Sequence, residues 1–322
     1  MSIPLQKHVK NTSRIAFGCM GLGGSWDKNT LTKSQLREAH DAVNTALESG
    51  IRFFDHADIY CHGKSESVFG EILMSMPNVR EQIVIQSKCG IRLEEGSLVG
   101  QYDASADWIQ TSVEASLKRL KTDYLDILLI HRPDPLMQVE EVADVFNRLH
   151  NEGKVKHFGV SNMHVHQIKY LQYYCDVPLI VNQLEMSLFK YGWVEETLHA
   201  GNAPLNTTHW SGGQLEHCAM NDIQIQAWGS LAQGLFSGRD ISSESLAVQN
   251  TAALVAELAA EYQTTKEAIV LGWLMRHPAN VQPVIGTIQP ERIKACTEAN
   301  SVLLSRNHWY KLLVTARGQA LP

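Results

Sequence analysis

Short apolar runs alternate with amphipathic stretches along the whole chain. The apolar runs are rich in branched and aromatic residues and are bounded by polar or turn-forming residues, a pattern that predicts strands. We expect eight strands, at Arg14–Phe17, Arg52–Asp55, Ile83–Ser87, Leu125–Ile130, Lys156–Val160, Leu179–Asn182, Ile223–Ala227 and Pro283–Ile285.

The stretches between these runs have the spacing of amphipathic helices. Ile109, Val113, Leu117 and Leu120 fall on one helical face, and a second face, Val139, Val142, Phe146 and Leu149, ends at Gly153. Further helices are expected at Lys33–Ser49, Ser65–Met76, His166–Tyr174, Leu246–Tyr262, Thr265–Arg276 and Pro290–Asn300.

Strands that alternate with helices predict βαβ units and a parallel sheet. Eight such units in 322 residues favour a closed (β/α)₈ barrel of the TIM type, with an open doubly wound sheet as the alternative. The composition does not change along the chain, so we expect one α/β domain over residues 1–322. The long stretch without periodicity, His199 to Gln214, is expected to be a loop that either covers a binding site, with Trp210 closing over the substrate, or is disordered.

Charge and composition exclude several classes of partner. The formal charge is −6 and the pI is about 6.2, which leaves no basic surface of the kind that binds nucleic acid. No stretch approaches the roughly 18 apolar residues that a membrane span needs, and the first residues lack a secretory pattern, so we expect a cytoplasmic protein without membrane contact. The six cysteines form no CxxC pair and are expected to be reduced.

Polar and aromatic residues stand where most of the expected strands end. In a barrel, catalytic groups lie at these carboxyl ends, and here they carry Asp55, Lys88, His131, Ser161, Asn162, Gln183, Trp228, Gly286 and Thr287. Asp55 and Lys88 end neighbouring strands, so an ion pair between them is expected. Tyr60 follows on the next loop, where Lys88 would lower the pKa of its phenol and let it act as a general acid.

The segment "FFDHADIYCHGKSE", residues 53–66, also has a metal-site interpretation. Asp55, His56 and Asp58 are metal-ligand types, but alternating residues of a strand face opposite sides, and no HxH or HExxH pair accompanies them. We therefore expect no metal and place His56 against the helices. Taken singly, Asp55, Lys88 and His131 could each be an ordinary polar strand end.

The same segments resemble the aldo-keto reductase family. The resemblance is carried by "GIRFFDHADIYCHGKSESVFG", "SKCG", "LLIHRPDP", "HFGVSN", "VNQLEMS" and "VIGTIQPERI", which follow in the family's order between about Arg14 and Asn300. It looks closest to bacterial members whose fourth strand also ends in His-Arg-Pro-Asp-Pro. The family implies reduction of an aldehyde or ketone by NADPH, and a catalytic tetrad of Asp55, Tyr60, Lys88 and His131. Tyr60 would donate the proton and His131 would orient the carbonyl oxygen.

The resemblance also implies which residues bind the cofactor. Ser161, Asn162 and Gln183 would hold the nicotinamide carboxamide, and Trp228 would stack on the ring. The segment Trp228 to Gly238 would surround the pyrophosphate, and the segment after the eighth strand would contact the adenosine phosphate. The implied residues of these two segments are Gly229, Ser230, Leu231, Gly234, Gly286, Thr287, Gln289 and Arg292.

Two features leave alternatives open. Many relatives have a lysine after strand eight that grips the 2′-phosphate, whereas this chain offers only Arg292 nearby, so NADH is not excluded. Potassium-channel β subunits are similar in fold and site, so a nucleotide-binding regulatory subunit with little turnover is the alternative function. The physiological substrate and the oligomeric state are not encoded in any pattern that we recognise.

Overall fold

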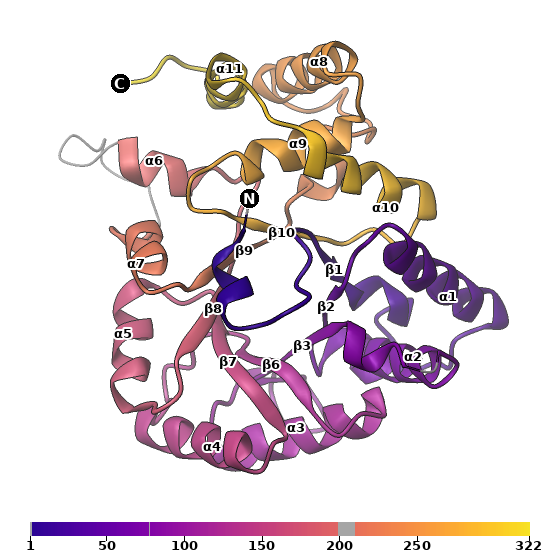
Figure 1. Cartoon of the computed structure of the whole chain (residues 1–322), viewed down its shortest axis with the longest axis vertical. Helices are drawn as coiled ribbons and strands as arrows, with labels where there is room; N and C mark the ends of the chain where they lie inside the picture. The colour runs from indigo at the N-terminus through magenta and orange to yellow at the C-terminus, as the bar shows by residue number, and fades with distance from the viewer. Residues whose placement is uncertain (1, 77, 199–209) are drawn as a thin grey trace.

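A closed barrel of parallel strands forms the centre of the molecule, within the residues that the computed structural model describes, 2–76, 78–198 and 210–322 (Figure 1). The order around the barrel is β1-β10-β9-β8-β7-β6-β3-β2. The strands are β1 Ala16–Gly18, β2 Phe53–Asp55, β3 Val84–Cys89, β6 Leu125–Ile130, β7 Val155–Ser161, β8 Leu179–Glu185, β9 Gln224–Trp228 and β10 Gln282–Ile285. The expected barrel of eight strands is therefore confirmed, and the open sheet is excluded.

Helices surround the barrel and connect its strands. They are α1 Lys33–Glu48, α2 Lys64–Met74, α3 Ala106–Leu120, α4 Val139–Asn151, α5 Val165–Tyr174, α6 Gly192–Leu198, α7 Gln214–Met220, α8 Leu246–Glu261, α9 Lys266–Met275, α10 Pro290–Thr297 and α11 Arg306–Arg317. Several begin at a side-chain cap: Ser105 accepts a hydrogen bond from the backbone amide of Trp108, and Thr265 accepts one from that of Ala268. Such caps satisfy amides that the first turn leaves free, which explains why the helices begin at these residues.

Two separate hydrophobic cores hold the barrel together. The larger one lies between the strands and the helices. The smaller one fills the amino-terminal part of the barrel interior, where Ile3, Leu5 and Val9 pack against inward-facing strand residues such as Phe53 and Ile127. Figure 1 shows the amino-terminal segment, with its short 3₁₀ helix Pro4–Lys7, lying across the centre of the barrel. Residues 3–9 thus close this end of the barrel.

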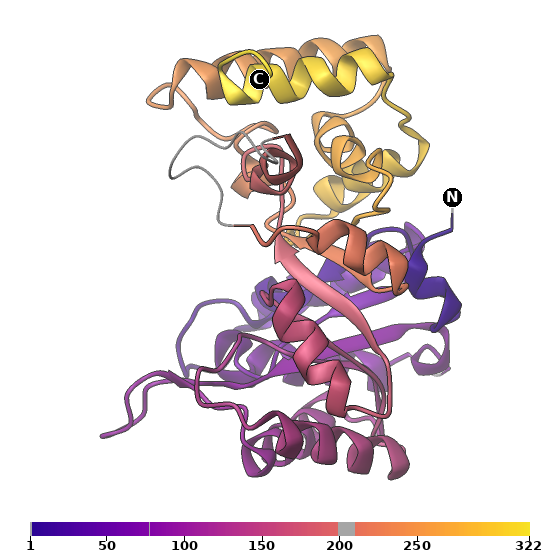
Figure 2. The same ribbon diagram turned by 90° about the vertical axis from the view of Figure 1, so that its left-hand side faces the viewer.

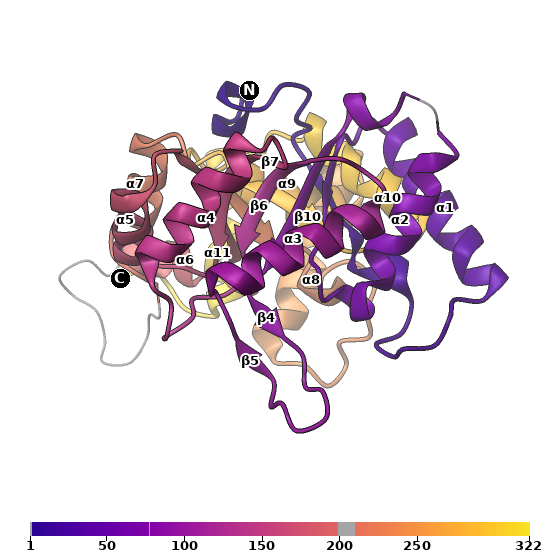
Figure 3. The same ribbon diagram turned by 90° about the horizontal axis from the view of Figure 1, so that it is seen from below.

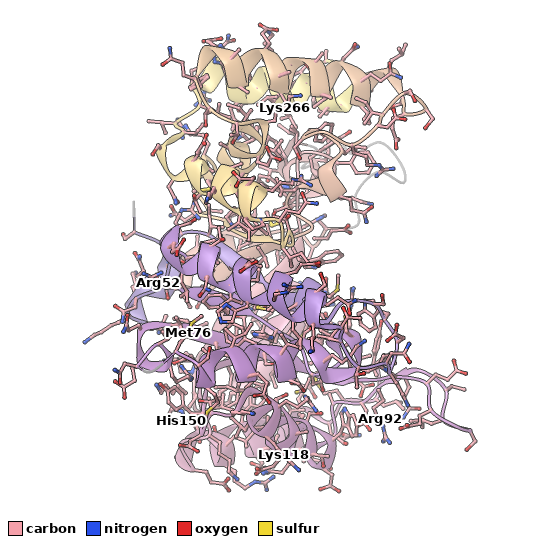
Figure 4. The ribbon with its side chains drawn as sticks, turned by 90° about the vertical axis from the view of Figure 1, so that its right-hand side faces the viewer. Arg52, Met76, Arg92, Lys118, His150 and Lys266 are labelled. Carbon is pink, nitrogen blue, oxygen red and sulfur yellow. The ribbon has the colours of Figure 1, made fainter. Side chains whose placement is uncertain are left out.

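Two features lie outside the simple barrel. Helices α8 and α11 pack side by side in a layer at one end of the molecule (Figure 2). Between β3 and α3, a two-stranded hairpin, β4 Ile91–Arg92 with β5 Gln101–Tyr102, forms an arm that extends away from the barrel (Figure 3). Arg92, labelled in Figure 4, lies on this arm and forms an ion pair with Asp103. The arm stands beside the carboxyl end of β3.

The differences from the predicted elements are small. Strand ends shift by up to three residues, so Lys88 and Gln183 lie within β3 and β8 rather than at their last positions. The hairpin and the short helices α6 and α7 were not predicted, because two-residue strands and seven-residue helices carry too few apolar positions to show a period. Most of the predicted loop, 199–209, lies outside the described residues, and the domain limits 1–322 stay a prediction. None of the helices within the described residues is both long and apolar enough to cross a membrane.

Candidate active site

A buried ion pair lies at the carboxyl ends of β2 and β3. The ammonium of Lys88 is 2.8 Å from both carboxylate oxygens of Asp55, and it donates further hydrogen bonds to the backbone oxygen of His56 at 2.8 Å and to the hydroxyl of Tyr60 at 3.0 Å. Lys88 is 1% exposed and Asp55 2%. Because its charge is both paired and hydrogen-bonded, Lys88 can stay buried as an ammonium.

The loop after β2 carries Tyr60 back over this pair. The backbone amides of His56 and Asp58 bond to the backbone oxygens of Gln86 and Lys88, which extends the pairing with β3 past the strand end. The chain then turns sharply, because Cys61 and His62 have φ of 50° and 58° and Gly63 has φ of 84°. Tyr60 lies directly before this turn, with its hydroxyl 3.0 Å from the ammonium of Lys88.

Burial and charge act in opposite directions on the Tyr60 hydroxyl. Burial raises the pKa of Tyr60, while the charge and hydrogen bond of Lys88 lower it, and the balance stays above the ordinary value of 10. Lys88 thus acts on the phenol in the expected direction, and burial is the larger effect. Burial alone would lower the pKa of Lys88, but Asp55 and Tyr60 raise it above its ordinary value. The phenol thus keeps its proton, and the ammonium keeps its charge.

His131 faces Tyr60 from the end of β6. Their rings are 6.0 Å apart between centroids and nearly perpendicular, and both residues line one cavity. Burial, together with the charges of Lys88 and Arg132, lowers the pKa of His131 to about 2. The imidazole is therefore neutral near pH 7, with one nitrogen able to donate a hydrogen bond and the other to accept one.

A second buried network supports the loop from behind. The carboxylate of Glu66 accepts a hydrogen bond from Ser87 at 2.6 Å and pairs with Arg119 at 2.7 Å. Burial and the nearby Glu66 raise the pKa of Asp58 to about 7. His56 points the other way, onto the ring of Phe69 in α2. The candidate metal ligands of this segment therefore face different surroundings, and no group of three or more such side chains gathers within the described residues.

The burial of His56 gives a test based on pH. Burial and the charge of Lys88 lower the pKa of His56 to about 3, whereas an unfolded histidine titrates near 6.5. Between these pH values the unfolded state binds the extra proton, so the free energy of unfolding falls as the pH falls, by up to about 1.4 kcal/mol per pH unit for this group. His56→Leu should make this loss shallower by about that amount between pH 6 and pH 4 in urea unfolding. An unchanged slope would show that His56 takes up its proton in the folded state.

A cavity of about 540 Å³ opens at the carboxyl end of the barrel. Its lining includes most of the residues predicted from the sequence, namely Asp55, Tyr60, His131, Ser161, Asn162, Gln183, Trp228, Gly229, Ser230, Leu231, Gly234, Gly286, Thr287 and Arg292. Lys88 lies just beneath it, bonded to Tyr60. Gln289 differs: it is exposed at the start of α10, and its backbone amide bonds to Thr287 instead of facing the cavity.

One part of the cavity wall consists of linked polar side chains. Ser161 donates a hydrogen bond to the backbone oxygen of Gln183 at 2.9 Å, and Asn162 donates one to Ser161 at 2.8 Å. The indole of Trp228 donates to the amide oxygen of Asn162 at 3.1 Å, which holds the aromatic ring at the cavity wall. Asn162 has φ of 58°, a left-handed conformation that asparagine tolerates better than most residues. This wall offers amide and hydroxyl groups beside a flat aromatic surface.

Another part of the wall suits an anion. Gly229 and Gly234 have φ of 66° and 80°, which turns the chain tightly, and a Cβ on Gly286 would meet only open space. The guanidinium of Arg292 lines the cavity, paired with Glu267 at 3.1 Å and bonded to Ser237 at 2.9 Å. A positive charge next to such glycine turns is the usual setting for phosphate groups.

Some lining and supporting residues were not predicted from the sequence, among them Arg132, Gln86 and Gln226. Arg132 lines the cavity and lies 5.7 Å from the centre of the Trp228 ring, and its position directly after His131 was the available signal. Gln86 and Gln226 lie buried inside the barrel and bond to Asp55 and Gln183. Glutamine at inward positions of β3 and β9 was the signal for them.

Trp210 lies apart from this cavity. Its ring is beside Gly192, and it lines an adjoining pocket of about 380 Å³ that shares Asn162 with the main one. The expectation that Trp210 closes over the substrate stays a prediction.

Comparison with known proteins assigns the chain to a family. The model of the aldo/keto reductase family matches residues 14–312. The chain belongs to the aldo/keto reductase family. The oxidoreductase YcsN of Bacillus subtilis, described as uncharacterized, is similar to this aldo/keto reductase at 34% identity over 93% of the chain and 94% of the relative. A 6-dehydroglucose reductase of Agrobacterium fabrum is also 34% identical, over 95% of each chain.

The fold of this aldo/keto reductase also matches solved structures. The structure of the glycerol dehydrogenase AKR11B4 from Gluconobacter oxydans superimposes with a TM-score of 0.80 at 21% identity, over 100% of this chain and 97% of that one. At this sequence identity the match supports the barrel fold and says nothing about function. Family membership makes the chain an oxidoreductase and leaves its substrate, its cofactor and the roles of its residues to be argued from the site.

Proposed function

We propose that this aldo/keto reductase reduces an aldehyde or ketone to an alcohol, with NADPH as hydride donor and Tyr60 as proton donor. The contact of 3.0 Å between the Tyr60 hydroxyl and the Lys88 ammonium is the observation that supports this most directly. A phenol that is protonated near neutral pH, and that has a fixed cation beside it, can give up its proton and leave a stabilised phenolate.

Each of the four tetrad residues has a separate task in this proposal. Tyr60 donates its proton to the carbonyl oxygen as negative charge develops there. Lys88 stabilises the phenolate that remains, and Asp55 holds Lys88 in place. The neutral imidazole of His131, across the cavity from Tyr60, orients the carbonyl by donating a hydrogen bond.

The two walls of the cavity fit the two ends of a nicotinamide dinucleotide. Ser161, Asn162 and Gln183 would hold the carboxamide with Trp228 against the ring, while the glycine-rich segment after β9 and Arg292 would hold the phosphates. Gly229, Ser230, Leu231 and Gly234 offer backbone groups there, and Gly286 and Thr287 complete the edge. When bound, the reduced cofactor supplies the hydride that reaches the carbonyl carbon.

The experiment uses the purified protein, its tryptophan fluorescence and a panel of carbonyl compounds. Titration with NADPH should quench the fluorescence, because Trp228 lies at the cofactor wall. Consumption of NADPH is then followed by absorbance with simple aldehydes, ketones and 6-dehydroglucose, the last suggested by the relative from Agrobacterium fabrum. Saturable consumption supports the proposal. Binding without consumption across the panel would favour the regulatory subunit, and lack of binding would reject both.

The choice of cofactor depends on Arg292 in this proposal. A charge-assisted hydrogen bond contributes about 1.5–3 kcal/mol, so Arg292→Leu should raise the Kd for NADPH by roughly 10- to 100-fold and change the Kd for NADH little. Arg148→Leu, an exposed arginine on α4, is the control and should change neither. Equal effects on both cofactors would mean that Arg292 does not contact the 2′-phosphate. A cytoplasmic location is part of the proposal and is tested by cell fractionation.

A further inference from the structure

A chain of buried glutamines runs through the barrel beneath the cavity. We call Gln86, Gln183, Gln226 and Gln282 the glutamine relay; each is at most 2% exposed. Gln183, Gln226 and Gln282 are register partners on β8, β9 and β10, so their side chains lie next to one another. Gln86 reaches Gln226 from β3 on the far side of the barrel, at 2.8 Å.

Hydrogen bonds set the direction of every amide in the relay. At one end, the backbone oxygen of Ser13 can only accept, so Gln282 turns its nitrogen to it at 2.7 Å and its oxygen toward Gln226. Gln226 donates to that oxygen at 3.0 Å and therefore presents its own oxygen inward. That oxygen accepts from Gln183 at 3.0 Å and from Gln86 at 2.8 Å.

The other end of the relay requires the same direction. The carboxylate of Asp55, charged and paired with Lys88, can only accept, and Gln86 donates to it at 2.6 Å. The amide nitrogen of Gln86 thus serves both Asp55 and Gln226, and its amide oxygen is left buried without a partner among the described residues. Turning Gln86 over would place its amide oxygen against the Asp55 carboxylate and the Gln226 amide oxygen, which both only accept. The unpaired oxygen of the observed orientation therefore costs less free energy than the reversed orientation would.

Within the relay, only the side-chain oxygen of Gln183 remains free to bind a ligand in the cavity. Its nitrogen is directed to Gln226, and no donor among the described residues bonds to its side-chain oxygen, while Gln183 lines the cavity wall. We infer that Gln226, anchored by Gln86 and Gln282, is a positioning residue that makes Gln183 present an acceptor to the cofactor. A site of this polarity selects a dinucleotide whose pyridine ring carries a carboxamide NH₂ and rejects one that carries a carboxylate. The inference rests on the proposed function and adds a specificity to it.

The first test needs only the wild-type protein. NADP⁺ and nicotinic acid adenine dinucleotide phosphate differ at the ring substituent alone, carboxamide against carboxylate, and their Kd values are measured by tryptophan fluorescence. A carboxylate facing the Gln183 oxygen loses a hydrogen bond and meets a like partial charge, so its Kd should be at least about tenfold higher. If NADH proves to be the preferred cofactor, the same pair without the 2′-phosphate is used.

Variants then separate the relay from general packing. Gln226→Met removes the amide that holds Gln183, which can then turn and donate to a carboxylate, so the ratio of the two Kd values should fall by about tenfold. Gln226→Glu should keep the wild-type ratio, because a buried neutral carboxyl can accept from Gln183 and Gln86 and donate to Gln282. Binding of 2′-phospho-ADP-ribose, which lacks the pyridine ring, should be the same in all variants.

The matched control is Gln224→Met. Gln224 is on the same strand, is equally buried, and bonds to the backbone of Leu5, Ile225 and Asn280 instead of joining the relay. It should keep the wild-type ratio even if it lowers stability.

Three outcomes would overturn the inference. These are equal Kd values for the two dinucleotides in the wild type, an unchanged ratio in folded Gln226→Met, and an equal loss of the ratio in Gln224→Met. If Gln226→Met does not fold, the test uses the wild type and Gln226→Glu. A ratio of the two Kd values near one in either protein would overturn the inference. If the wild-type protein binds neither NADPH nor NADH, both the proposed function and this inference are wrong. If it binds the carboxamide and carboxylate dinucleotides equally well, only the inference about the relay is wrong.

Discussion

Tyr60→Phe is expected to lower kcat by roughly 10²- to 10⁴-fold, the contribution of a positioned general acid. The variant keeps the ring that packs against His131 and removes only the hydroxyl that bonds to Lys88. The Kd for NADPH, measured by tryptophan fluorescence, should stay within about twofold, because the proton donor is needed for the chemical step and not for cofactor binding. The measurement compares kcat with the best substrate of the panel.

Tyr191→Phe is the control for this substitution. Tyr191 is also half-buried, and its hydroxyl bonds weakly to the backbone oxygen of Ala316, outside the cavity. It should leave kcat unchanged. A Tyr60→Phe enzyme with nearly the wild-type kcat would mean that another group, such as a water molecule or His131, delivers the proton.

Lys88→Met is expected to damage both folding and turnover. Removal of the ammonium leaves Asp55 as a buried carboxylate without its counter-ion, and breaking a buried pair in this way costs about 3–5 kcal/mol of unfolding free energy. The phenolate of Tyr60 would also lose its stabilising charge, so kcat should fall at least as far as in Tyr60→Phe. Urea unfolding and steady-state kinetics measure the two effects.

The double variant Asp55→Asn/Lys88→Met separates stability from catalysis. It removes both charges, so most of the lost stability should return, whereas kcat should stay low because the cation beside Tyr60 is still missing. If the free energy of unfolding of the single variant Lys88→Met lies within about 1 kcal/mol of the wild-type value, Asp55 becomes protonated or reaches solvent in that variant. A double variant that recovers kcat would remove Lys88 from the mechanism.

The parts of the site that depend on strand order could be predicted from the sequence. Asp55, Lys88 and His131 follow apolar runs that become neighbouring strands, and the carboxyl ends of parallel strands meet at one edge, so their proximity follows from topology alone. Tyr60 was found for the same reason, since a short loop cannot carry it far from Asp55. The family resemblance then added cofactor-binding residues, and all of these line the cavity except Gln289, which is exposed at the start of α10.

The parts that depend on degree of burial or on contacts across the barrel could not be predicted. The pKa of Tyr60 depends on a balance between burial and the Lys88 charge, and the sequence shows which groups are present but not how much water each retains. The bond between Gln86 and Gln226 joins residues 140 positions apart on opposite walls. Only the tilt and register of the closed barrel decide which inward side chains meet, and neither can be read from hydrophobic periodicity.

The closure of the barrel by residues 3–9 also limits how reactants reach the chemistry. With one end filled by Ile3, Leu5 and Val9, the cavity has to be entered and left from the opposite end. A molecule bound near this opening would obstruct the exit of one bound deeper in the cavity. The order in which reactants bind and products dissociate would then follow from the shape of the barrel. Slow release of a product bound near the opening would slow the release of the molecule bound deeper.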